Sequence, residues 1–214
     1  MLAKVLSCSV VGLEGTAVEV EVDIYSNALP SITLVGLPDA AVKESSERVR
    51  AALVNSGLLY PRGRLTVNLA PADLRKVGPV YDLPIAVSLL AASGQAPLDR
   101  LEKSLFIGEL SLDGTLRHID GVLPMAHMAQ QQGIETVYLP EVDAPEAALI
   151  QGIDVIPVPS MSTLVSHLRD FDPIPVFEHK ESLDEVEDAP YSVDFADIKG
   201  QVYTQIDSAL HAPF

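Results

Sequence analysis

The sequence has a single cysteine, Cys8, among its 214 residues. One thiol cannot pair within the chain, so a disulfide framework is excluded and a reducing compartment is indicated. Cys8 lies in the alternating stretch LSCSV, which is typical of a buried structural thiol rather than a reactive one. The fold must therefore be stabilised by a hydrophobic core, and a chain of this length is able to bury one.

Long apolar runs are also lacking. No run approaches the roughly 18 residues that a transmembrane helix needs, so none is expected. The N-terminal stretch MLAKVLSCSVVGLEG has no long apolar core behind a basic end, and Glu14 interrupts it early, which argues against a signal peptide. These absences predict a cytoplasmic protein without a membrane partner.

Basic residues are scarce, because 14 Lys and Arg stand against 30 Asp and Glu and give a net charge of −16. Binding to phosphates needs clustered cations, so the chain is not expected to bind nucleic acid electrostatically as a whole. Four basic residues nevertheless flank one expected strand: Arg62, Arg64, Arg75 and Lys76. A local basic patch is therefore an open alternative, although solvated loop charges are the simpler interpretation.

Most motifs that carry chemistry are missing. The sequence contains no G-x-x-x-x-G-K-[ST] and no Gly-Lys pair, so it has no phosphate-binding P-loop. No serine lies in a G-x-S-x-G elbow, although a triad built from distant residues stays open. The five histidines show no H-E-x-x-H and no metal-ligand spacing: His118, His127, His167, His179 and His211. We therefore expect no cofactor and no metal in this chain.

What the sequence does contain is a pattern typical of a mixed α/β fold. Period-two alternation predicts a hairpin over 4–12 and 16–26, and further strands at 31–36, 64–70, 105–114, 136–140 and 154–159. Helices are predicted at 40–57, about 83–92, 121–133, 144–152 and 160–170. Asp39 and Ser160 are the expected N-caps of the first and last helix. Hairpins first and strand–helix alternation later indicate one mixed sheet with helices packed on it.

The composition changes after Arg169. The segment from Asp170 to Asp197 contains ten acidic residues, and Lys180 is its single Lys or Arg. This indicates a first domain over 1–170 and an acidic linker over 171–191, which is most simply a solvated segment without a partner of its own.

Three blocks of the sequence carry a family resemblance: GLPDAAVKESSERVRAAL, LTVNLAPADLRKVGPVYDLPIA and FIGELSLDGTLRHIDGVLPMAHMA. They resemble the proteolytic domain of Lon and, more closely, the N-terminal domain of the Mg-chelatase-like AAA+ ATPases of the ComM/YifB family. The blocks keep the family's order and spacing and cover residues 1 to about 170. The resemblance implies the Lon-C-like form of the ribosomal S5 domain 2-like fold.

The loop RKVGPVYDLPIA raises the question of catalysis. In active Lon the residue after Gly-Pro is the serine nucleophile, and the position of its lysine partner falls early in the helix after the Gly-Glu-Leu strand. Here these positions are Val80 and Leu123. A Ser-Lys dyad needs a hydroxyl and a desolvated amine, so the resemblance implies a degenerate, proteolytically dead site. We expect both side chains to be buried close to one another.

The polar neighbours of this loop have simple structural interpretations. Asp82 precedes Leu83 and Pro84 and is expected to be a helix N-cap. Lys76 is expected to be an exposed loop charge. A rescued dyad of Ser88 with Lys76 is not expected, because the Ser88 hydroxyl lies inside a helix and should bond a backbone carbonyl.

The C-terminal stretch SVDFADIKGQ resembles the start of the AAA+ module in this family, where it helps to form the adenine pocket. The matching residues are Phe195, Asp197, Gly200 and Gln201. Residues 202–214 depart from the family pattern and no Walker A loop follows. Residues 192–214 are therefore interpreted as a truncated AAA+ opening, in a fragment, a truncated gene product or a chain with an unrelated tail, and no ATP binding is expected.

These observations predict a non-catalytic N-terminal accessory domain of a ComM/YifB-type ATPase. For the full-length family the resemblance implies a hexameric motor that uses ATP and Mg²⁺, acts on DNA and is linked to branch migration in natural transformation. The implied partner of this chain is the AAA+ ring, with DNA bound only through the ATPase module. Two alternatives stay open: a latent Ser-Lys-type peptidase with a displaced site, and a free-standing module that binds a peptide or nucleotide near Val80.

Overall fold

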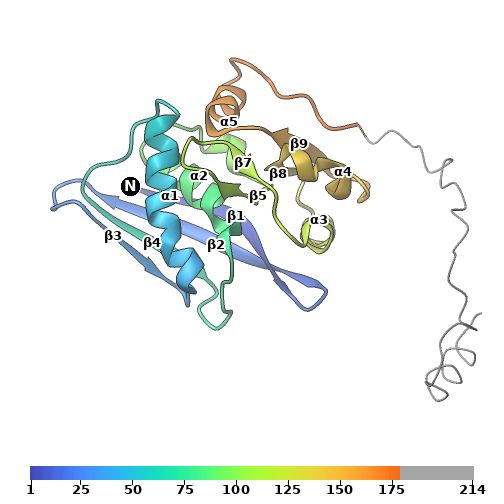
Figure 1. Ribbon diagram of the computed structural model, residues 1–214, viewed down its shortest axis with the longest axis horizontal. Helices are drawn as coiled ribbons and strands as arrows, with labels where there is room; N and C mark the ends of the chain where they lie inside the picture. The colour runs from blue at the N-terminus through green and yellow to red at the C-terminus, as the bar shows by residue number, and fades with distance from the viewer. Residues whose placement is uncertain (179–214) are drawn as a thin grey trace, which may run out of the picture. The chain divides into compact units, whose positions relative to one another are not determined.

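The computed structural model describes residues 1–178, which form a mixed sheet with helices packed against it (Figure 1). The seven strands of the sheet lie in the order β3-β4-β2-β1-β5-β8-β9. Their bounds are β1 Leu2–Val11, β2 Glu14–Tyr25, β3 Ser31–Val35, β4 Arg64–Ala70, β5 Ser104–Phe106, β8 Thr136–Pro140 and β9 Asp154–Val158. The predicted mixed α/β fold class is confirmed. The predicted adenine-pocket residues 195–201 lie outside the described part.

The first half of the sheet is built on the predicted hairpin. β1 and β2 pair antiparallel from Leu2↔Asp23 to Val11↔Glu14. β4 runs antiparallel to β2, and β3 lies parallel to β4 at the edge of the sheet. Because side chains alternate between the two faces of a strand, Val18, Val20 and Val22 of β2 are fully buried on one face while their neighbours are not.

The second half of the sheet is parallel. β5 pairs with β8 and β8 with β9, while β5 joins the first half through the single pair Leu6↔Leu105 of β1. Two short strands, β6 (Glu109–Leu110) and β7 (Leu116–Arg117), form a separate antiparallel ribbon after β5.

The principal helices are α1 (Ala40–Asn55), α2 (Asp82–Ala92), α3 (Val122–Gln131) and α5 (Met161–Leu168), with the single turn α4 at Ala144–Ala147. Every residue of α2 is buried, because this helix packs on β1 and β2 and also contacts α1. Both predicted caps are confirmed: Asp39 Oδ1 accepts from the Val42 N–H at 2.8 Å, and Ser160 Oγ accepts from the Thr163 N–H at 3.3 Å.

The chain continues along the parallel half after α5. The Ile174 N–H donates to His167 Nδ1 at 2.9 Å, and the Phe177 N–H donates to the Val155 carbonyl of β9 at 2.8 Å. The described residues, 1–178, belong to one compact unit. In the described part of the chain, no helix combines the length and the apolar character that crossing a bilayer requires.

Candidate functional site beside Val80

The Gly-Pro loop is held by the N-terminal end of α1. The Gly78 N–H donates to Asp39 Oδ2 at 3.2 Å, while the other oxygen of the same carboxylate caps α1. Two backbone hydrogen bonds extend this attachment, from the Asp39 N–H to the Lys76 carbonyl and from the Lys76 N–H to the Leu37 carbonyl. Gly78 has φ +83°, a conformation that glycine adopts without strain, and the chain then enters the short 3-10 turn η1 at Pro79–Tyr81.

Val80 lies in this turn at the wall of a pocket of about 320 Å³. Its side chain is buried, with 7% exposure, and its carbonyl accepts from the Gly108 N–H at 3.0 Å. The polar and loop residues of the wall are Ser9, Gly78, Glu109, His118 and Asp120. The loop therefore keeps a shaped pocket, but Val80 offers it no nucleophilic atom.

Leu123 departs from our expectation. It is 39% exposed and is not part of the pocket wall, so the prediction that it is buried beside Val80 is wrong. The cause is the orientation of α3, which buries the helical stripe formed by Val122, Met125, Ala126 and Ala129. Leu123 lies outside this stripe, and its N–H donates to Glu146 Oε1 at 3.0 Å.

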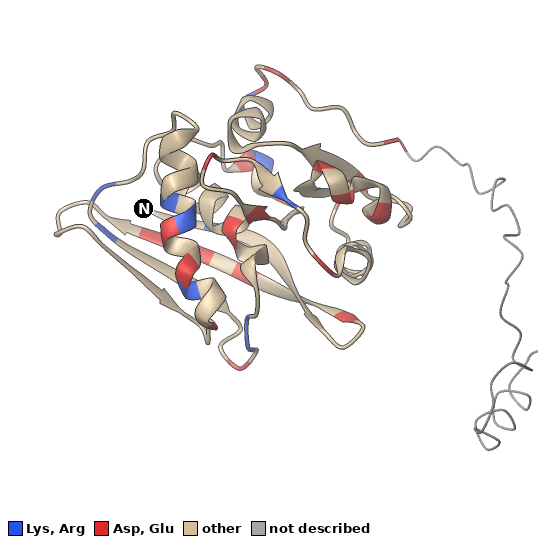
Figure 2. Ribbon diagram, viewed as in Figure 1, with Lys and Arg blue, Asp and Glu red and all other residues tan. Residues whose placement is uncertain are grey.

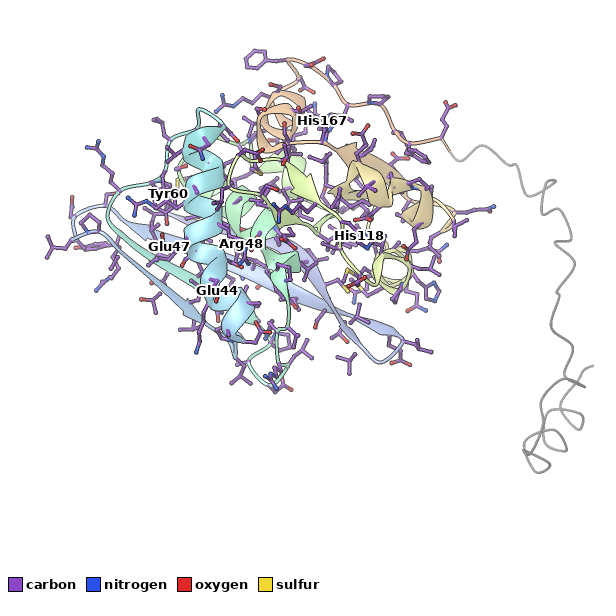
Figure 3. All side chains as sticks on the ribbon, viewed as in Figure 1. Glu44, Glu47, Arg48, Tyr60, His118 and His167 are labelled. Carbon is purple, nitrogen blue, oxygen red and sulfur yellow. The ribbon has the colours of Figure 1, made fainter. Side chains whose placement is uncertain are left out.

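His118 is a polar feature of the pocket that the sequence did not single out (Figure 3). Its Nδ1 hydrogen-bonds the carboxylate of Asp143, which is buried and also accepts from the Ile119 N–H at 3.0 Å. Its Nε2 lies 3.5 Å from Asp120 Oδ1. The hydrogen bond to Asp143 is the main cause that raises the pKa of His118. A buried carboxylate thus orients the imidazole and favours its charged form.

The charge of the pocket decides what it accepts. Glu109 and Asp120 belong to its wall, and the amide of Gly78 is already used by Asp39. The carboxylates of the wall would repel a phosphate, and the glycine amide suited to bind one is not available because it already donates to Asp39. The pocket is therefore better matched to a basic or hydrogen-bond-donating group than to a nucleotide.

The two residues of the rescued dyad are engaged elsewhere. Lys76 is fully buried and its Nζ donates to the Pro71 carbonyl, so the prediction of an exposed loop charge is wrong. The loop folds back against Leu37 and Asp39 and covers this side chain, and burial lowers the pKa of Lys76. The Ser88 hydroxyl donates to the Val20 carbonyl at 3.4 Å, as a backbone-satisfied serine should. Across residues 1–178 no serine hydroxyl is hydrogen-bonded to a lysine amine.

Asp82 is also not the N-cap that the sequence predicts. It is the first residue of α2 and its side chain is fully buried. Its carboxylate faces Arg48 of α1, with Nε to Oδ2 at 2.7 Å, and accepts from the Leu110 N–H at 3.2 Å. Burial raises the pKa of Asp82, and Arg48 opposes that shift. Through these two contacts Asp82 links α2 to α1 and to β6, next to the pocket.

Comparison with known proteins identifies relatives of this chain. The chain is 41% identical over 175 residues to the competence protein ComM of Haemophilus influenzae, and 46% identical over 149 residues to the uncharacterized protein YifB of Salmonella typhimurium. These alignments cover 82% and 70% of this chain, but only 34% and 29% of ComM and YifB. The chain therefore spans about a third of the length of these relatives.

A weaker similarity extends to proteases. The Lon protease of Mycoplasmopsis agalactiae is 25% identical over 167 residues, which cover 72% of this chain and 16% of Lon. The family model of subunit ChlI of Mg-chelatase matches residues 18–143, more than half of the chain. By that match, and by its similarity to ComM and YifB, the chain belongs to the Mg-chelatase-like AAA+ ATPase family of subunit ChlI.

Proposed function

We propose that this chain is a non-catalytic accessory domain of a ComM/YifB-type ATPase. The observation that carries the proposal is the loop at Gly78–Val80, which has the shape of a nucleophile loop but presents a buried valine. The lysine position, Leu123, lies outside the pocket. A Ser-Lys mechanism needs both groups at one point, so the shape serves packing and partner contact instead.

We propose that nucleotide chemistry belongs to the other part of such ATPases. The whole sequence lacks the Gly-Lys pair of a P-loop, and the acidic wall of the Val80 pocket disfavours phosphate, so the described residues do not fit ATP and Mg²⁺. In a full-length protein the AAA+ module would hold ATP and Mg²⁺, assemble into a hexameric ring and act on DNA. This domain would pack against that ring. A cytoplasmic location is part of the proposal and rests on the single buried Cys8.

A second candidate function follows from the Val80 pocket itself. Its volume of about 320 Å³ suits one side chain, and Glu109 and Asp120 provide acceptors for a basic group. This supports the binding of a peptide through a lysine or arginine side chain, and it disfavours the nucleotide version of the binding-module alternative.

The purified chain tests these proposals directly. We expect no ATP hydrolysis and no casein cleavage, and we expect co-purification with the separately expressed ATPase module of a ComM/YifB-type relative. Casein cleavage that survives replacement of Val80 by alanine would establish a peptidase with a displaced site. Failure to bind the ATPase module, together with saturable binding of a lysine-containing peptide that Glu109→Gln with Asp120→Asn abolishes, would favour the binding module.

A further inference from the structure

The open edge of the sheet carries a second surface, remote in sequence from the Val80 loop. β3 is the terminal strand, and within residues 1–178 it pairs with β4 alone. Figure 1 shows α1 lying along this side of the sheet. The start of β3, the exposed flank of α1 and the loop before β4 enclose a groove of about 370 Å³, which we call the β3–α1 groove. Its main lining residues are Ile32, Glu47, Arg50, Val54, Tyr60 and Arg62.

In the part of the chain that the structure describes, the backbone of β3 has hydrogen-bonding groups without a strand partner at the open edge of the sheet, beside this groove. In a parallel pair, the N–H and C=O of alternate residues point toward the partner strand. The Ser31 N–H points toward β4, since it donates to the Gly63 carbonyl at 3.1 Å. The backbone groups of Ile32 and Leu34 therefore point away from β4, into the open edge. A terminal strand of this kind is a template for one more strand.

The floor of the groove is apolar. Ile32 and Leu65 contribute from β3 and β4, and Val54, which is 55% exposed, contributes from α1. Exposed Leu59 lies in the loop just before Tyr60. An apolar floor beside a terminal strand packs against the aliphatic stems of the side chains that an added peptide directs toward it.

The rim of the groove is basic, in a chain whose net charge is −16. The guanidinium of Arg50 lies 5.7 Å from the ring centroid of Tyr60, and that of Arg64 lies 5.5 Å from the ring of Tyr25. Figure 2 shows basic positions on the loop that leads from α1 into β4. Glu47 is the opposing carboxylate in the lining. Among the ion pairs of the described residues, none involves Arg50, Arg62 or Arg64.

We propose that the β3–α1 groove binds an extended acidic segment of another polypeptide, which adds as a strand beside β3 and pairs its carboxylates with Arg50 and Arg62. Stacking on tyrosine holds the Arg50 guanidinium in place, so less side-chain entropy is lost when it binds a carboxylate. Successive side chains of a strand point to opposite faces, so the carboxylates face α1 and the groove, while the side chains that alternate with them cover the opposite face of the sheet beside β3. This proposal is independent of the function assigned to the Val80 pocket.

A nucleic acid fits the groove less well. A sugar-phosphate backbone accepts hydrogen bonds but offers no N–H groups to pair with the free carbonyls of β3.

The probe is a short fluorescent peptide in which glutamates alternate with valines, titrated into the purified 214-residue chain and followed by anisotropy. We expect saturable binding that weakens as salt rises. Arg50→Gln with Arg62→Gln should weaken it about tenfold or more, which corresponds to two lost charge-assisted bonds. The matched control is Arg75→Gln, a charge change at an exposed residue outside the groove, which should alter binding less than about twofold.

Two further measurements test the strand addition itself. A peptide N-methylated at alternate residues should lose binding, and the unmodified peptide should slow amide exchange at Ile32 and Leu34. Equal binding of the N-methylated peptide would overturn strand addition. Binding of a single-stranded oligonucleotide with the same arginine dependence, and none of the acidic peptide, would overturn the choice of partner. Insensitivity of peptide binding to the Arg50 and Arg62 changes would remove the groove from consideration.

Discussion

Arg48 and Asp82 form a two-pronged ion pair that joins α1 to α2. Arg48 Nε lies 2.7 Å from Asp82 Oδ2 and its Nη2 lies 3.0 Å from Oδ1. Nη2 also reaches the Ala41 carbonyl and the Ser45 hydroxyl, so the guanidinium is held at several points. The carboxylate is fully buried, and the pair lies directly behind the loop that carries Val80.

Replacing Arg48 with methionine should therefore be strongly destabilising. It leaves the buried Asp82 carboxylate without its charged partner, and we expect a loss of about 3 kcal/mol in the free energy of unfolding. Urea unfolding at neutral pH measures this. The matched control is Arg100→Met, which breaks an exposed pair with Asp170 and should cost less than about 1 kcal/mol. Adding Asp82→Asn to Arg48→Met should recover part of the loss, and equal costs for the two single variants would contradict the argument.

Val80→Ser should lower stability without restoring proteolysis. The change removes buried methyl groups, at a cost of about 1–3 kcal/mol. Leu123→Lys should be tolerated within about 0.5 kcal/mol, because Leu123 is substantially exposed.

The double variant Val80→Ser with Leu123→Lys should also fail to cleave casein. A solvated lysine keeps its proton at neutral pH and cannot act as the general base for a serine. Thermal unfolding and a casein assay of the three variants check these expectations. Robust cleavage by Val80→Ser alone would show that His118, the imidazole of the same pocket, serves as the base.

Gly36→Ala should disrupt the end of β3. Gly36 has φ +97°, and a Cβ atom there would lie 2.1 Å from the Leu69 carbonyl oxygen of β4. Backbone strain and this clash together should cost more than about 2 kcal/mol. Gly57→Ala is the matched control, because Gly57 also has a positive φ but its Cβ would meet open space. Urea midpoints of the two variants that agree within error would show that the backbone contact at Gly36 is not required.

The His118–Asp143 pair should make stability depend on pH. The pKa of His118 is raised in the folded protein, so its contribution is fully present below the ordinary value of 6.5 and is lost as pH rises through the folded pKa. We expect the urea midpoint of the wild type relative to His118→Gln to fall as pH rises above the ordinary pKa of 6.5. His127→Gln is the control, because its ring bonds Gln131 instead of a carboxylate. A difference that stays constant with pH would contradict the pairing.

Local signals explain which parts of the fold were predictable. Asp39 and Ser160 cap helices through atoms only three residues away, so their sequence neighbours are sufficient to recognise them. The long alternation of β1 and β2 fixes both strands and the face that each buries. The stripe of α3 that includes Val122 and Met125 also carried enough information to predict that Leu123 is exposed.

The site depended on contacts that no local pattern contains. His118 and Asp143 are 25 residues apart, and Arg48 and Asp82 are 34 apart. Each pair forms only after separate elements have packed, so a propensity for capping or exposure is overridden by tertiary burial. Lys76 illustrates the same effect, because an exposed conformation was the simpler expectation until the loop closed over it.

The sheet contains a seam between β1 and β5. β1 is joined to β2 by ten register pairs but to β5 by the pair Leu6↔Leu105 alone. Side-chain packing holds the two halves together elsewhere. Helix α3 follows the ribbon of the second half and packs on β1 and β2 of the first half. Apolar packing weakens on cooling and under pressure, whereas the backbone ladder within each half responds less. Cold or high pressure should therefore separate the two halves of the sheet along this seam before either half loses its own strands.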